Sequence, residues 1–120
     1  MTIQRIQHNG GVCAVIRGAE KVIVDPQTAL ELLMEAKETA GTKCLVVPKQ
    51  LIAEDFFILS TGLAGEILQK LVNYGGRIAV YGDFSRYTSK PLKAFMLESN
   101  KGRDVYFAAT ETEAIEAMTR

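Results

Sequence analysis

The chain has 120 residues, of which 48% are apolar and 23% are charged, and its 14 basic residues balance 14 acidic ones. A chain of this size and composition can bury about two-thirds of its unfolded surface in one core, so we expect one domain over residues 1–120. The zero net charge argues against nucleic acid or a membrane surface as a partner. No apolar run approaches the roughly 20 residues of a membrane span, and residues 1–5 do not resemble a secretion signal, so we expect a cytoplasmic protein.

The N-terminal residues predict a β-hairpin. Residues 2–7 and 12–16 read as strands, and Asn9-Gly10 between them is a strong signal for a two-residue hairpin turn. His8 has no metal-ligand partner nearby in the sequence, so we interpret it as a turn residue. A catalytic histidine is the alternative.

A short strand and a helix are predicted next. The strand covers residues 21–24. Asp25 and Pro26 suit the N-cap and the first position of a helix, whose apolar residues recur at intervals of three and four up to a stop at Gly41. Another strand is predicted at residues 43–47.

The remaining sequence continues this alternation. After a short helical turn within residues 50–59, a helix is predicted from about Thr61 to Tyr74, and a buried strand at 77–81. A third helix at 90–99 and a strand at 104–108 follow.

The last predicted element is a helix that follows the capping-box spacing of Thr110 and Glu113. Four strand–helix units with short connections imply parallel strands joined by right-handed crossovers. We therefore expect an α/β fold of consecutive βα units, with a mixed, mostly parallel sheet and an N-terminal β-hairpin. Its strands lie around residues 12–16, 43–47, 78–81 and 105–108, and the side chains expected to be largely buried are Leu45, Val47, Ile78, Val80 and Phe107.

The sequence shows no recognisable catalytic, metal or cofactor site. Cys13 and Cys44 lie in separate apolar runs without a Cys-x-x-Cys spacing, so we expect two free, buried and unreactive thiols, joined by neither a disulfide nor a metal. No glycine-rich phosphate-binding pattern occurs, which argues against a nucleotide cofactor.

Several multi-residue motifs spread over nearly the whole chain resemble those of the bacterial domain-of-unknown-function family numbered 4180. They are Asp55-Phe56-Phe57, the run from Thr61 to Lys70, Asn73-Tyr74, Gly82-Asp83-Phe84-Ser85, Ser89, and the run from Glu98 to Arg103. The family is itself uncharacterised, so this resemblance implies no activity.

A second, more distant resemblance is to the anti-sigma-factor antagonist domains (STAS, SpoIIAA-like). Those domains carry an Asp-Ser-Ser/Thr-Gly-Leu motif at the start of a helix, and here the corresponding residues are Leu59-Ser60-Thr61-Gly62-Leu63, with Leu59 in place of the Asp. The helix end at Gly75-Gly76 and the strand after it follow in the same order. The resemblance implies a STAS-like fold and a regulatory, protein-binding role.

Ser60, Thr61 and Gly62 form the first candidate site. A phosphate on Ser60 or Thr61 would lie at a helix N-terminus, whose free N–H groups and dipole favour an anion. The alternative is that Ser60 or Thr61 is simply the N-cap of the helix.

Asp83, Ser85 and Arg86 form the second candidate site. They follow a predicted parallel strand, and ligands of such sheets bind beyond the carboxyl ends of the strands. These residues could hold a small polar ligand, but no base stands beside the serine. The alternative is that Asp83 and Ser85 tie the loop by side-chain to backbone hydrogen bonds.

Lys101 and Arg103 suggest an anion patch after the third predicted helix. Basic residues beside the dipole of a helix C-terminus, with Asn100 or Gly102 in the left-handed conformation, explain the segment equally well.

Two classes of function agree with these observations. The first is a non-catalytic regulatory or protein-interaction module, with another protein or a second copy of the chain as partner. The second is a small polar-ligand-binding protein, or a weak enzyme, that uses the loop from Asp83 to Arg86.

Overall fold

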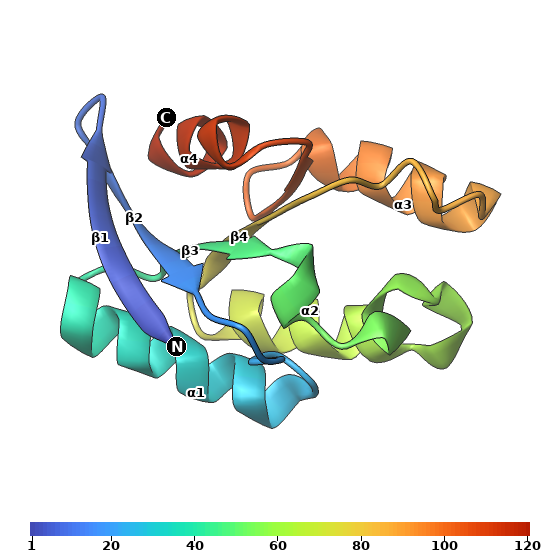
Figure 1. The fold of residues 1–120 in the computed structure, drawn as a ribbon, viewed down its shortest axis with the longest axis horizontal. Helices are drawn as coiled ribbons and strands as arrows, with labels where there is room; N and C mark the ends of the chain where they lie inside the picture. Colours follow the sequence, from blue (N-terminus) through green and yellow to red (C-terminus); the bar gives the residue numbers. More distant parts are fainter.

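A five-stranded β-sheet organises the computed structural model, which describes residues 1–120 (Figure 1). The strands lie side by side in chain order; β1 is antiparallel to β2, and β2 to β5 are parallel. Their bounds are Thr2–His8, Gly11–Arg17, Cys44–Pro48, Arg77–Tyr81 and Val105–Ala108 for β1 to β5. The predicted mixed sheet with an N-terminal hairpin is therefore confirmed.

Four α-helices alternate with the parallel strands. They are α1 Pro26–Ala40, α2 Leu63–Asn73, α3 Lys90–Asn100 and α4 Glu111–Thr119, and three short 3-10 turns lie between β3 and α2. Each right-handed crossover advances by one strand in the same direction, so α1, α2 and α3 contribute to one face of the sheet. Of the four helices, only α4 contributes buried residues to the other face.

Local signals explain the turn of the hairpin and the ends of α1. Asn9 and Gly10 have φ angles of 50° and 81°, the two left-handed conformations that a type I′ turn requires. Asp25 Oδ1 accepts a hydrogen bond from the Thr28 N–H at 2.8 Å, and Thr28 Oγ1 accepts one from the Asp25 N–H at 3.1 Å. Gly41 then ends α1 in the left-handed conformation.

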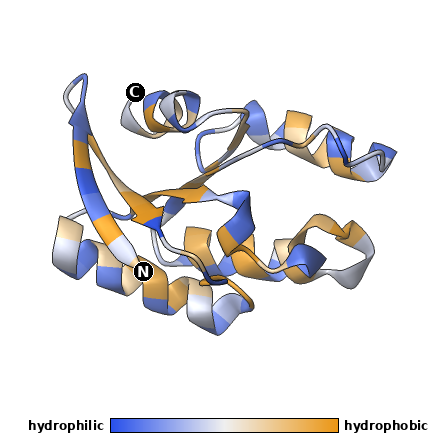
Figure 2. Ribbon diagram, in the orientation of Figure 1, coloured by the Kyte–Doolittle hydropathy of each residue, from blue (hydrophilic) through white to orange (hydrophobic).

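The hydrophobic core has two layers of unequal size. The first layer has 22 buried residues between the sheet and α1, α2, the 3-10 turns and Leu92 of α3. The second has 8 buried residues, contributed by the opposite face of the sheet and by α4. The five side chains predicted to be buried all lie in the first layer. Figure 2 shows the inner strands mostly in hydrophobic colours, whereas β1 at the edge alternates.

Three predictions about local structure are wrong, and the start of one helix differs by two residues. Residues 21–24 form no strand; Ile23 makes one isolated parallel bridge to Ile52, because the N–H groups of Val22 and Ile23 both bond to the carbonyl of Leu51 in a 3-10 turn. The second helix begins at Leu63, two residues later than predicted, because Gly62 is its N-cap. The other two concern the last two helices.

The end of α3 and the start of α4 differ from the predicted caps. Lys101 is the C-cap of α3 with right-handed backbone angles, so neither Asn100 nor Gly102 takes the left-handed conformation. The Asn100 side chain is instead bound to β5, as described below. Thr110 caps α4 by accepting a hydrogen bond from the Glu113 N–H at 3.2 Å, but the reciprocal half of the capping box is not formed.

None of the four α-helices combines the length and the hydrophobicity that a membrane crossing requires.

Candidate functional site

A pocket of about 430 Å³ lies at the carboxyl ends of β4 and β5. The connection after β4 leads to α3 on one face of the sheet, and the connection after β5 leads to α4 on the other face. A crevice forms where neighbouring parallel strands send their connections to opposite faces, and this is where α/β proteins bind ligands. We call this pocket the β4–β5 crevice; its lining is Gly82, Asp83, Phe84, Ser85, Met96, Leu97, Asn100, Phe107, Ala108 and Ala109.

The wall of the β4–β5 crevice is mainly apolar. Phe84 meets Phe107 edge to face, with ring centroids 6.0 Å apart, and Phe107 is buried in the core. Leu97 of α3 is 68% exposed, more than any other large apolar side chain of the chain. Contact with another molecule at the crevice would therefore remove apolar surface from water, which is favourable.

Asp83 and Ser85 lie in the crevice, as predicted for the second candidate site, but Arg86 is not part of its lining. Asp83 Oδ1 accepts a hydrogen bond from the Ser85 N–H at 2.9 Å. Hydrogen bonding to the Ser85 side chain and backbone lowers the pKa of Asp83, so the exposed carboxylate is ionised at neutral pH. This is the loop tie that the sequence offered as the alternative.

Tyr87 fastens the far end of the same loop. Its hydroxyl donates to Glu54 Oε1 at 3.0 Å, Lys49 Nζ lies 4.9 Å from the ring centroid, and the ring stacks on Phe57 at 5.3 Å. Partial burial and the hydrogen bond to Glu54 raise the pKa of Tyr87 to about 12. The loop is therefore held at both ends, which keeps the crevice preformed.

Asn100 closes the other side of the crevice, in a role that no sequence pattern indicated. Its Oδ1 accepts from the Phe107 N–H at 2.7 Å, and its Nδ2 donates to the Phe107 carbonyl at 2.9 Å. Since β4 lies on the opposite side of β5, these backbone groups point to the free edge of the sheet. One amide side chain thus replaces the strand pairing that the edge lacks.

The first candidate site, Ser60 to Gly62, lines none of the pockets. Gly62 has a φ of 77° and is the N-cap of α2. Thr61 Oγ1 lies 2.9 Å and 2.8 Å from the carbonyl oxygens of Asp55 and Ile58, and accepts from the Leu63 N–H at 3.2 Å. Ser60 is exposed and its hydroxyl makes no hydrogen bond. Because the N-cap of α2 is Gly62, the alternative that Ser60 or Thr61 is the N-cap is wrong.

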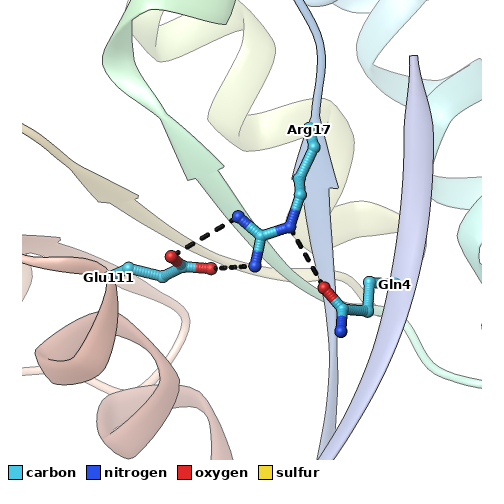
Figure 3. A network of polar contacts seen from close by, with 3 residues as sticks. All are labelled: Gln4, Arg17 and Glu111. Atoms are coloured by element: carbon cyan, nitrogen blue, oxygen red, sulfur yellow. Dashed lines mark hydrogen bonds and ion pairs between the residues drawn. The ribbon is translucent and has the colours of Figure 1, made fainter.

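Figure 3 shows a polar cluster that the sequence did not reveal, at the carboxyl end of β2. Arg17 donates to both carboxylate oxygens of Glu111, at 2.7 Å and 3.5 Å, and its Nε donates to Gln4 Oε1 at 3.0 Å. Burial and the Glu111 charge raise the pKa of the nearby Tyr81. The cluster joins the hairpin to the first residue of α4. The three guanidinium nitrogens of Arg17 all donate to side chains of the protein itself.

Both cysteine sulfurs are unpaired. Cys13 is buried, and burial together with the neighbouring Cys44 raises its pKa to about 11. Cys44 is half-buried, so the prediction that both thiols are buried is correct only for Cys13.

These features define a class of protein. It is a small α/β protein whose strands lie in chain order, with a preformed crevice between two strands whose following helices lie on opposite faces of the sheet. The chain belongs to the family described as a domain of unknown function (DUF4180), whose model matches residues 8–118. No curated protein and no solved structure matches the chain.

Proposed function

We propose that the chain is a non-catalytic, regulatory interaction module whose β4–β5 crevice receives an apolar side chain of a protein partner. The observation that carries this proposal is the open, preformed apolar crevice with Leu97 exposed at its rim. Apolar anchors in such pockets supply much of the binding energy of protein interfaces.

The titratable groups of the chain support a binding role over a catalytic one. Asp83 is the only titratable side chain in the crevice lining, and its lowered pKa makes it a poor proton carrier near neutral pH. The Cys13 thiol, with a pKa of about 11, stays protonated and is a weak nucleophile. His8 lies at the tip of the hairpin, where its Nε2 meets only Asn9 Nδ2, at 3.1 Å.

The regulatory part of the proposal rests on the resemblance of residues 59–63 to the STAS antagonist motif, and we assign the modification to Ser60. A phosphate on Ser60 would break no hydrogen bond, whereas one on Thr61 would disrupt the contacts to Asp55 and Ile58. The proposal includes a cytoplasmic location, which the two unpaired thiols support. Mass spectrometry of protein from its native cell, covering residues 59–70 in several growth states, tests it; full coverage without phosphate contradicts it.

A site-specific photo-crosslinker tests the crevice. We expect a benzophenone side chain in place of Leu97 to form one discrete crosslinked product in native cells. The matched control carries the same group in place of Val72, which is 38% exposed on α2 and outside every pocket. Products of equal yield at both positions, or none at Leu97, contradict the proposal.

A small polar ligand is the second candidate, because Asp83 and Ser85 both line the crevice. An ionised carboxylate there would favour a ligand with an amino or hydroxyl donor. Such a ligand should raise the melting temperature of the wild-type protein but not that of Asp83→Asn. Arg86→Gln should respond like the wild type, since Arg86 lies outside the lining. No stabilisation by any amine or polyol excludes this candidate.

A further inference from the structure

A second pocket, of about 470 Å³, lies at the amino ends of β4 and β5, between the ends of α3 and α4. We propose that it binds a small anion that carries phosphate groups. Four cationic side chains, and no acidic one, line it; they are Arg77, Lys101, Arg103 and Arg120. This basic pocket contains three of the six arginines of the chain.

Arg77 forms part of the basic pocket with donor capacity to spare. Its Nε donates to the Arg103 carbonyl at 2.8 Å. Its two Nη atoms reach only the Met118 and Ala117 carbonyls, both at 3.5 Å, and the Cys44 sulfur at 3.8 Å. Well-formed N–H···O bonds are close to 2.9 Å, so these long contacts leave the guanidinium able to bind an anion more strongly.

Arg103 and Arg120 have no acidic partner. The two ion pairs of the structure join Arg17 to Glu111 and Lys101 to Glu98, and neither involves these arginines. The Arg120 guanidinium lies over the Tyr106 ring, 5.5 Å from its centroid, which orients it at the pocket. Arginine is the side chain best suited to phosphate because its planar donors bind two oxygens at once.

The helix ends do not account for this concentration of charge. The C-termini of α3 and α4 contribute about half a negative charge each, roughly one in total. Even with Lys101 neutralised by Glu98, three arginines face that single charge. The three arginine side chains therefore leave the pocket with a positive balance, which favours a small anion that carries phosphate.

The surroundings favour a small molecule over a nucleic acid chain. Glu113 and Glu116 line the hollow on the far side of Tyr106 and Arg120. A polyanion that extended from the basic pocket into this hollow would meet these carboxylates, whereas a compact ligand would not. The chain as a whole carries no net charge, which weakens its attraction for a long polyanion.

Titration calorimetry with pyrophosphate as the probe tests the proposal. We expect saturable binding to the full chain, and a Kd about tenfold higher in Arg103→Gln and in Arg120→Gln, as for the loss of one charge-assisted contact. Neither side chain makes a hydrogen bond within the protein, so both variants should fold. The matched control is Lys93→Gln, which removes one exposed charge of α3 outside the pocket and should leave the Kd unchanged.

Three outcomes would overturn the proposal. One is the absence of saturable pyrophosphate binding at millimolar concentration. Another is an equal Kd in the wild type and both arginine variants, which would place the anion elsewhere. The third is equal binding of chloride at matched ionic strength, since simple charge screening does not distinguish the two anions.

Discussion

Asn100 takes the place that a sixth strand would have beside β5, because both polar atoms of its amide bind the backbone of Phe107. We expect Asn100→Ala to lower the free energy of unfolding by about 1–3 kcal/mol, since two backbone groups at a partly buried edge lose their partners. Urea denaturation measures the change. Asn73→Ala is the control, because Asn73 bonds only to Gln69 on the surface of α2, and its effect should stay within about 0.5 kcal/mol. Equal effects would contradict the assigned role.

The Cys13 thiol should make stability depend on pH in the alkaline range. Its folded-state pKa of about 11 exceeds the unfolded value near 9, so its contribution is complete below about pH 9 and is lost as pH rises through 11. The free energy of unfolding should fall by about 2 kcal/mol between about pH 8 and about pH 10.5. Denaturation at about pH 8 and about pH 10.5 measures it, and Cys13→Ala should show a smaller fall. Tyr81 and Tyr87 titrate in the same direction in both proteins, so only the difference reports on Cys13.

The hydroxyls of Ser60 and Thr61 should differ in their effect on stability. Thr61→Ala removes contacts to Asp55, Ile58 and Leu63 and should cost about 1–2 kcal/mol. Ser60→Ala removes an exposed hydroxyl without partners and should change stability by less than about 0.5 kcal/mol. Thermal unfolding of both variants measures the contrast, and a larger loss in Ser60→Ala would refute it.

At the scale of single residues, the sequence predicted those contacts that join residues close together along the chain. The N-cap at Asp25, the stop at Gly41 and the Asp83 loop tie each involve residues within four positions of one another. The pairing of Asn100 with Phe107 could not be predicted, because it depends on where α3 ends relative to the edge of the sheet. The cluster of Arg17 with Glu111 joins residues 94 positions apart and left no local pattern.

Strand β4 is the element on which the first core layer depends most directly. Val80 is fully buried between the neighbouring strands β3 and β5. Val80→Ala should therefore destabilise the protein by roughly 1–3 kcal/mol through lost burial and a cavity. The matched control is Val72→Ala on α2, where the side chain is 38% exposed and the loss should be less than about 1 kcal/mol. Chemical denaturation of both variants gives the comparison, and equal losses would contradict the layer assignment.

The elements with a clear hydrophobic period and a clear start or stop signal in the sequence were predicted correctly. A segment without such signals was not. The four parallel strands and the helices α1, α2 and α3 begin and end within one or two residues of their predicted positions. For α4 only the start was predicted. Residues 21–24 have the β-branched composition of a strand, but only Ile23 finds a bridging partner, in Ile52. A strand needs a neighbouring strand, and composition does not reveal whether one is present.

At the scale of the molecule, α4 alone shields the second face of the sheet. Without it, the buried side chains Cys13, Val15, Val46 and Ala79 would meet water. A chain that ends at Ala109 should therefore bind a hydrophobic dye and lose cooperative thermal unfolding. The full-length control is Glu116→Ala, which changes only the exposed side of α4 and should unfold like the wild type. A truncated chain that unfolds cooperatively without dye binding would contradict this role.

Both pockets are products of the whole fold. The sequence pointed to Asp83 and Ser85 and to Lys101 and Arg103, because those residues are neighbours along the chain. It did not point to Leu97, Phe107, Arg77 or Arg120, which reach the same pockets from other elements. It also included Arg86, which lies in the right loop but outside the crevice lining. Loop composition therefore indicated part of the lining of each pocket, but the other lining residues depend on tertiary packing.

The agreement between strand order and chain order has a consequence for how the protein is made. As the chain leaves the ribosome, each new strand emerges after the partner on which it docks, so the sheet can extend by one strand at a time without waiting for distant segments. The second face is covered later, because α4 is synthesised after all five strands. Until α4 emerges, the nascent sheet has one face covered by helices and one apolar face exposed to water. A chaperone that binds apolar surface would therefore bind the nascent chain during this interval.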